Sequence, residues 1–176
     1  MGTQEITITN SQVPRGTLKI AETLPSPDSV PPGTEIVLRF VRGEFVNLAS
    51  LVMLATWRKS LPAEVITWIE SDHCEETVIR LLQNTGFKEV FEEGLELPHV
   101  HSSRGRVPLR PITSSTRVEQ AVKDVVENIF EDYSHINVEA FRKLISELTE
   151  NVLVHSEAIY PGYTGARQLS QKEMTY

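Results

Sequence analysis

The sequence EIVLRFVRGEFVNLASLVMLATWRKSLPAEVITWI, residues 35–69, decides the fold of this 176-residue chain. Its first seven residues form a mostly apolar run that is typical of a buried strand. The run VITWI at its end, residues 65–69, is rich in β-branched and aromatic side chains and predicts a second strand. Residues 47–60 contain few β-branched residues and predict a helix, which Asn47 can cap and Pro62 ends. The stretch therefore predicts a strand, a helix and a second strand.

A second helix follows directly, and together these elements predict an α/β fold. The sequence ETVIRLLQNTGF, residues 76–87, predicts a helix that ends near Gly86, which can adopt the left-handed conformation of a C-cap. Parallel strands need a crossover connection, which is usually helical, so we expect a parallel or mixed sheet with helices packed on it. Upstream, alternating apolar residues bounded by Pro and Gly predict short edge strands. These residues are Ile6, Ile8, Leu18 and Ile20.

Charge and composition exclude several classes of protein. Seventeen Lys and Arg residues stand against 24 Asp and Glu residues, so we expect no basic face for nucleic acid or an anionic membrane. The longest apolar stretch, Phe45 to Trp57, is interrupted by polar residues and is too short to span a bilayer. The single cysteine, Cys74, allows no internal disulfide, and the N-terminus is polar with no apolar core of a signal peptide. We therefore expect a cytoplasmic protein.

Two helices with the clearest periodicity in the sequence are expected in the last third of the chain. The first is expected over residues 117–133, after a capping box formed by Thr116 and Glu119. The second is expected from Val138 to His155, capped by Asn137. Apolar residues at three- and four-residue spacing predict an apolar stripe on each helix, which is covered by the rest of the chain or by a partner. The two stripes comprise Val118, Ala121, Val122, Val125, Val126, Ile129, Phe130 and Tyr133, and then Phe141, Leu144, Ile145, Leu148 and Val152.

The segment before these helices, residues 96–116, is interpreted as a linker or a lid-like connection. Prolines interrupt its pattern, and it contains several arginines and two histidines, His99 and His101. The two histidines could share one side of an extended strand and bind a metal. A zinc site uses three or four ligands, however, and the sequence offers no partner set. We therefore interpret His99 and His101 as a pair on a surface loop.

The last predicted helix carries the residues with the clearest chemical purpose. Glu147, Asn151 and His155 are four residues apart, so they form one polar row beside the apolar stripe. An Asn side-chain oxygen suits Mg²⁺, a Glu can position or deprotonate a water, and a His at a helix end can contact a phosphate. The row is interpreted either as a face for a Mg²⁺-bound nucleotide or as a solvated helix side with contacts at i,i+4 spacing.

The string SELTENVLVHS, Ser146 to Ser156, resembles the Asn-containing box of the GHKL ATPase superfamily, which includes gyrase-type ATPases, histidine kinases and anti-sigma-factor kinases. Matched residue by residue, the resemblance implies that Glu147 is the catalytic general base and Asn151 the Mg²⁺ ligand. It implies that His155 binds the cofactor on the phosphate side. Mg²⁺ and ATP are the cofactors that it implies, and an ATPase or kinase activity follows from them.

The first part of the chain is similar to STAS-like domains, in the strand, turn and helix of EIVLRFVRGEFVNLASLVMLATW. Asn47, Leu48 and Ala49 stand where phosphorylated members carry Asp and Ser, so we expect no phosphorylation switch there. The two resemblances divide the chain into three parts. These are a STAS-like α/β domain over 1–95, a linker over 96–116, and the N-terminal part of a GHKL-type α/β sandwich over 117–176.

The sequence departs from the GHKL pattern after His155. It contains no Asp-x-Gly-x-Gly segment to bind adenine and no Gly-rich lid, so we expect the chain to stop just inside the ATPase fold and not to hydrolyse ATP alone. The resemblance implies a bacterial signalling or regulatory protein that acts through a protein partner or as a homodimer. Two alternatives remain open: Mg²⁺-ATP binding or catalysis completed by a partner chain, and a self-associating structural module.

Overall fold

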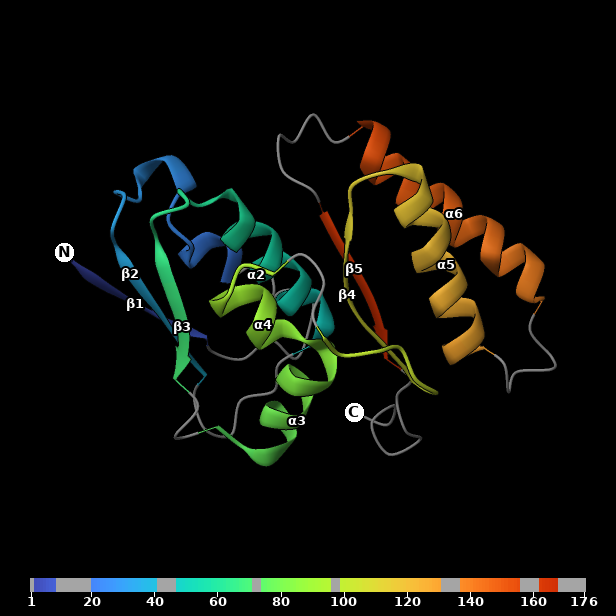
Figure 1. Cartoon of the computed structure of the whole chain (residues 1–176), viewed down its shortest axis with the longest axis horizontal. Coiled ribbons are helices and arrows are strands. Elements are labelled where there is room, and N and C mark those ends of the chain that lie inside the picture. The colour runs from blue at the N-terminus through green and yellow to red at the C-terminus, as the bar shows by residue number, and fades with distance from the viewer. Residues whose placement is uncertain are drawn as a thin grey trace.

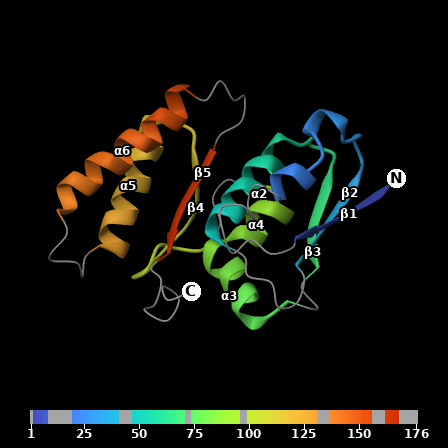
Figure 2. The ribbon, with the colours of Figure 1, turned by 180° about the vertical axis from the view of Figure 1, so that it is seen from behind.

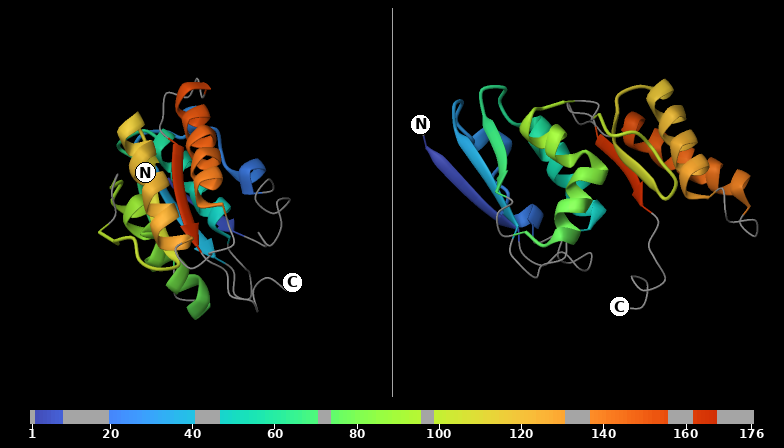
Figure 3. Two further views of the ribbon diagram at one scale, coloured as in Figure 1. Left: turned by 90° about the vertical axis from the view of Figure 1, so that its right-hand side faces the viewer. Right: turned by 60° about the horizontal axis from the view of Figure 1, so that its bottom comes forward.

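The fold alternates sheet and helix in four layers, as the computed structural model shows (Figures 1 and 3). A parallel sheet of three strands comes first, followed by a layer of helices, an antiparallel pair of strands and an outer pair of helices. The protein is therefore an α/β protein with two separate sheets. The structure describes residues 2–8, 20–40, 47–70, 74–95, 99–130, 137–155 and 162–167.

The first sheet has the order β1-β2-β3, with all neighbouring strands parallel. Its strands are β1 (Thr3–Ile8), β2 (Glu35–Phe40) and β3 (Ile66–Glu70). Ile6, Leu38 and Ile69 are register partners across the sheet, and all three are buried. The sequence-based prediction of strands at both ends of residues 35–69 is thus confirmed, as is the position of Ile6 in an edge strand.

The helices α2 (Leu48–Ser60), α3 (Glu76–Thr85) and α4 (Phe87–Glu92) form the next layer. The side chain of Asn47 accepts a hydrogen bond from the backbone N–H of Ser50 at 2.8 Å, which confirms its role as the cap of α2. Gly86 separates α3 from α4 with φ 66° and ψ 18°, the left-handed conformation that glycine adopts without steric cost. The two helices predicted in this region are therefore confirmed.

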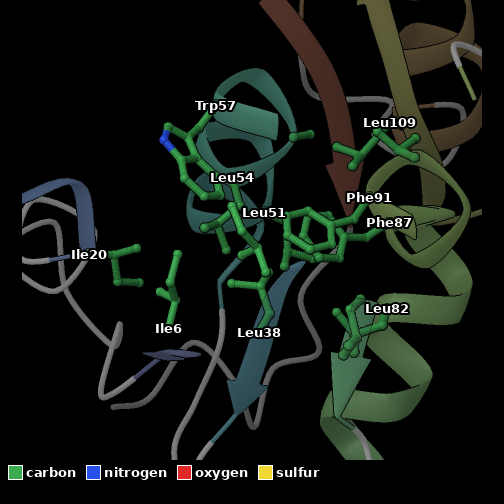
Figure 4. Close-up of a cluster of buried hydrophobic side chains, with 14 of the residues drawn as sticks. Ile6, Ile20, Leu38, Leu51, Leu54, Trp57, Leu82, Phe87, Phe91 and Leu109 are labelled. Atoms are coloured by element: carbon green, nitrogen blue, oxygen red, sulfur yellow. The ribbon is translucent and has the colours of Figure 1, made fainter. Parts of the chain in front are cut away.

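Apolar side chains from this helix layer fill the space between the two sheets (Figure 4). Leu51 and Leu54 of α2 and the stacked rings of Phe87 and Phe91 are completely buried there. Leu109, which belongs to the second sheet, lies in the same cluster. The helix layer thus buries apolar area on both of its sides, which stabilises the contact between the two sheets.

The second sheet consists of β4 (Arg106–Ile112) and β5 (Gly162–Arg167), which pair antiparallel. Strand β4 falls within residues 96–116, the segment interpreted above as a linker, so that interpretation is wrong for residues 106–112. Pro108 lies where the register shifts between Val107 and Arg110. Proline cannot donate a ladder hydrogen bond and is tolerated in strands at edges and bulges, which is why the prolines concealed this strand. The division of the chain into domains stays a prediction.

The outer layer consists of α5 (Ser115–Ile129) and α6 (Val138–His155). Both helices occur where the periodicity predicts them, and Asn137 caps α6 by accepting a hydrogen bond from Ala140 N–H at 3.0 Å. The capping box predicted at Thr116 and Glu119 is wrong. Helix α5 begins earlier, and the side chain of Ser114 accepts a hydrogen bond from Arg117 N–H at 3.3 Å.

The prediction of a strand around Leu18 and Ile20 is also wrong for Ile20, which the structure describes. Residues 20–23 are helical, and Leu24 N–H donates to the Ile20 carbonyl at 3.1 Å. Leu18 lies outside the described residues. The residues that follow Ile20, Ala21 and Glu22, favour a helix, and two apolar residues are too few to define a period of two.

Candidate functional site

The polar row predicted on the last helix lies on α6, where Glu147 and Asn151 are both exposed. One turn of helix separates them, a rise of about 6 Å along the axis. His155 is the last residue of α6, and its side chain lies outside the described part of the structure. The structure therefore places two of the three residues on one helix side that is open to solvent.

The opposite side of α6 packs against α5. Val138 and Ile145 contact a buried cluster of Ile112, Val118, Val122 and Val126, which joins the end of β4 to α5. The ring of Phe141 lies 4.0 Å from that of Phe130 between centroids. Thr149 is buried as well, and its hydroxyl donates to the Ile145 carbonyl at 2.7 Å. The buried side of α6 thus follows residues 138, 141, 145 and 149.

This packing leaves two large apolar residues of α6 uncovered. Leu144 is 51% exposed and Leu148 is 54% exposed, so this part of the predicted apolar stripe is not covered within the described structure. Helix α6 lies on the outside of the molecule beside α5, as the view from behind shows (Figure 2). Helix α5 contacts the side of α6 that carries Val138 and Ile145. The side chains of Leu144 and Leu148 lie on a different side of α6 and are therefore not covered by α5.

The exposed leucines and the polar row share one surface. On an ideal helix, Leu144, Leu148 and Asn151 fall within about 60° of one another, and Glu147 lies about 40° beyond Asn151. We call the surface formed by Leu144, Glu147, Leu148 and Asn151 the outer face of α6. It combines two uncovered apolar side chains with a carboxylate and an amide.

The outer face lies on the solvent-open side of one helix and by itself does not fit a Mg²⁺-nucleotide site. Mg²⁺ bound with a nucleotide completes its octahedral ligands with phosphate oxygens and waters, so such a site needs a second surface that holds the phosphates beside Glu147 and Asn151. Among the described residues, no group of three or more His, Cys, Asp and Glu side chains could hold a metal ion. Mg²⁺ and ATP therefore remain a prediction from the resemblance alone.

A polar hollow that the sequence does not predict lies beside β4 and α5. It is lined by His101, Ser102, Arg110, Arg117, Gln120, Ala121 and Asp124 and has a volume of about 430 Å³. The sequence contains a signal for it, since histidines and arginines are concentrated in residues 99–117. The concentration of these residues did not predict a site, because residues 96–116 were interpreted as a linker. A linker does not hold side chains in fixed positions.

Comparisons with protein-family models, with curated proteins and with solved structures give no match to this chain. The class that the fold defines is accordingly an α/β protein with a parallel three-stranded sheet and an antiparallel two-stranded sheet. None of the helices in the described ranges is long and apolar enough to cross a membrane.

Proposed function

We propose that this protein is a bacterial cytoplasmic regulatory protein that acts by binding another protein through the outer face of α6. The observation that carries the proposal is the exposure of Leu144 and Leu148, each more than half open to solvent on the same side of one helix. Leucines exposed next to each other on a helix typically mark a surface that a partner covers. A STAS-like domain followed by a GHKL-type module, the finer fold assignment, agrees with such a role.

We propose that the partner is a second copy of this chain. Lys143, Glu147 and Glu150 are exposed, and on an ideal helix they fall within about 60° of one another along one flank of the leucine pair. When two such helices pack antiparallel about a two-fold axis, the same flank of each helix meets its copy. Lys143 of one chain then lies beside Glu147 or Glu150 of the other, so the face is self-complementary in charge.

The first prediction concerns the oligomeric state. The wild-type protein is expected to be a dimer by size-exclusion chromatography with multi-angle light scattering, and Leu148→Glu is expected to be a monomer. A carboxylate at this position would have to be desolvated beside an apolar surface, which weakens the dimer at least about tenfold. Because Leu148 is exposed, the variant should keep the circular dichroism spectrum of the wild type.

Ile66→Glu is the matched control, since Ile66 is 56% exposed on β3, far from α6 in the four-layer arrangement. This variant should remain dimeric. A monomeric wild-type protein, or a dimer that persists in Leu148→Glu, would contradict the proposal.

The second candidate function is Mg²⁺-ATP binding or catalysis completed by a partner chain. It is favoured by the exposure of Glu147 and Asn151 on one face, because a partner can reach both side chains. The position of both side chains on the solvent-open side of a single helix favours the interaction role instead.

Calorimetry separates the two functions. Titration of the purified protein with ATP and Mg²⁺ is expected to show no saturable heat at sub-millimolar concentrations that depends on Asn151, because one helix side open to solvent cannot desolvate a nucleotide. A saturable, Mg²⁺-dependent isotherm that disappears in Asn151→Ala but persists in Ala140→Ser, a small change on the same helix, would establish the nucleotide function instead.

A further inference from the structure

We propose that the hollow beside β4 and α5 binds a small oxyanion, namely the phosphate or carboxylate group of a small molecule. Its walls come from three places in the chain: His101 and Ser102 precede β4, Arg110 belongs to β4, and the remaining residues lie on α5 between Arg117 and Asp124. This site is separate from the outer face of α6, and its test is independent of the proposed function.

A hydrogen-bonded carboxylate organises the hollow. Asp124 accepts a hydrogen bond from the Ser102 hydroxyl at 2.8 Å and one from the Gln120 amide at 2.7 Å. Its carboxylate also lies 3.8 Å from Nε of Arg110, and both side chains are largely buried. Two hydrogen bonds thus hold the Asp124 carboxylate, and its negative charge attracts the Arg110 guanidinium across a gap too long for a hydrogen bond.

The charge of the hollow is positive after this pairing. Arg110 and Arg117 carry two positive charges against the one negative charge of Asp124, and the His101 imidazole can add a hydrogen-bond donor. A guanidinium has five N–H donors, so the contact of Arg110 through Nε leaves donors for a ligand. Among the described residues, Arg117 and His101 have no side-chain hydrogen bond or ion pair with another residue.

The lining identifies the class of ligand. Two planar guanidinium groups match the geometry of a phosphate or carboxylate, which they bind through paired N–H donors. Apart from Ala121 the residues that line the hollow are polar or charged, which suits an anionic group. Its volume of about 430 Å³ lies within the range of small-molecule sites. Arg117 also belongs to the first turn of α5, where the helix dipole favours an anion.

Nuclear magnetic resonance titration tests the site directly. Inorganic phosphate and acetate are added separately to ¹⁵N-labelled protein, with sodium chloride adjusted to keep the ionic strength constant, since exposed charges are screened by salt. We expect saturable shifts of the backbone amides of Arg117, Gln120 and Asp124 with at least one of the two anions. The comparison of phosphate with acetate shows which oxyanion the hollow prefers.

Two arginine variants complete the experiment. Arg117→Gln removes an exposed charge and keeps the fold, and it is expected to weaken the binding at least about tenfold because a charge-assisted, forked contact is lost. Arg142→Gln is the control, since Arg142 is an exposed arginine on α6 outside the hollow. The absence of saturation with both anions, or equal binding by Arg117→Gln and the wild type, would overturn the proposal.

Discussion

Replacement of Leu109 by alanine is expected to lower the free energy of unfolding by about 3 kcal/mol. Leu109 is completely buried, although it belongs to the two-stranded sheet and not to the sheet that defines the first half of the fold. Its side chain lies with Phe87 and Phe91 in the cluster between the two sheets (Figure 4). Truncation removes buried methyl groups and leaves a cavity that close-packed neighbours fill only in part.

Urea unfolding measures this effect with two probes that report on different parts of the chain. Tryptophan fluorescence follows the first half, which contains Trp57 and Trp68, and circular dichroism follows the whole molecule. We expect the same shifted midpoint by both probes, because Leu109 connects the helix layer to the second sheet. Ile66→Ala, a truncation at an exposed strand position, should cost less than about 1 kcal/mol. A loss below that value for Leu109→Ala would contradict the shared core.

Replacement of Arg58 by alanine is the second change with a large expected effect, a loss of about 2–4 kcal/mol. Nε of Arg58 donates to the Thr67 hydroxyl at 2.7 Å and to the Phe91 carbonyl at 3.1 Å, and a terminal nitrogen donates to the Val65 carbonyl at 3.4 Å. Burial lowers the pKa of this guanidinium below its usual value, yet arginine stays charged at neutral pH. Its removal deprives the Thr67 hydroxyl of β3 and the Val65 carbonyl of a donor, while the Phe91 carbonyl keeps the hydrogen bond from the Thr67 hydroxyl.

The matched control for Arg58 is Arg80→Ala on α3. Arg80 is exposed and pairs with Glu76 one turn away, an arrangement that contributes less than about 0.5 kcal/mol. Arg58→Lys should retain part of the stability, because an ammonium group can still donate to one of the acceptors. Equal midpoints for Arg58→Ala and Arg80→Ala in urea unfolding would show that Arg58 does not tie β3 to α4.

At the candidate site, local sequence patterns predict which residues share a side of a helix but not which side is buried. The i,i+4 spacing placed Glu147 and Asn151 correctly on one side of a helix, and the structure shows both exposed there. The same periodicity placed Leu144 and Leu148 in one apolar stripe with Phe141 and Ile145, but it cannot distinguish a side that a neighbour covers from a side that none covers. Helix α5 decided that question by packing against Ile145 and leaving the leucines open.

By itself the sequence determined the elements whose signals are local. The strands and helices of residues 35–87, the Asn47 cap and the left-handed Gly86 follow from side-chain branching, backbone sterics and hydrogen bonds between near neighbours. Only the tertiary structure decided which surfaces are covered. Strand β4 forms because it pairs with β5, which follows α6 in the sequence. The hollow forms where Asp124 of α5 lies beside Arg110 of β4. Such contacts join residues that are far apart in the chain. They stabilise the protein only after the packed layers have brought these residues together, so no local sequence pattern predicts them.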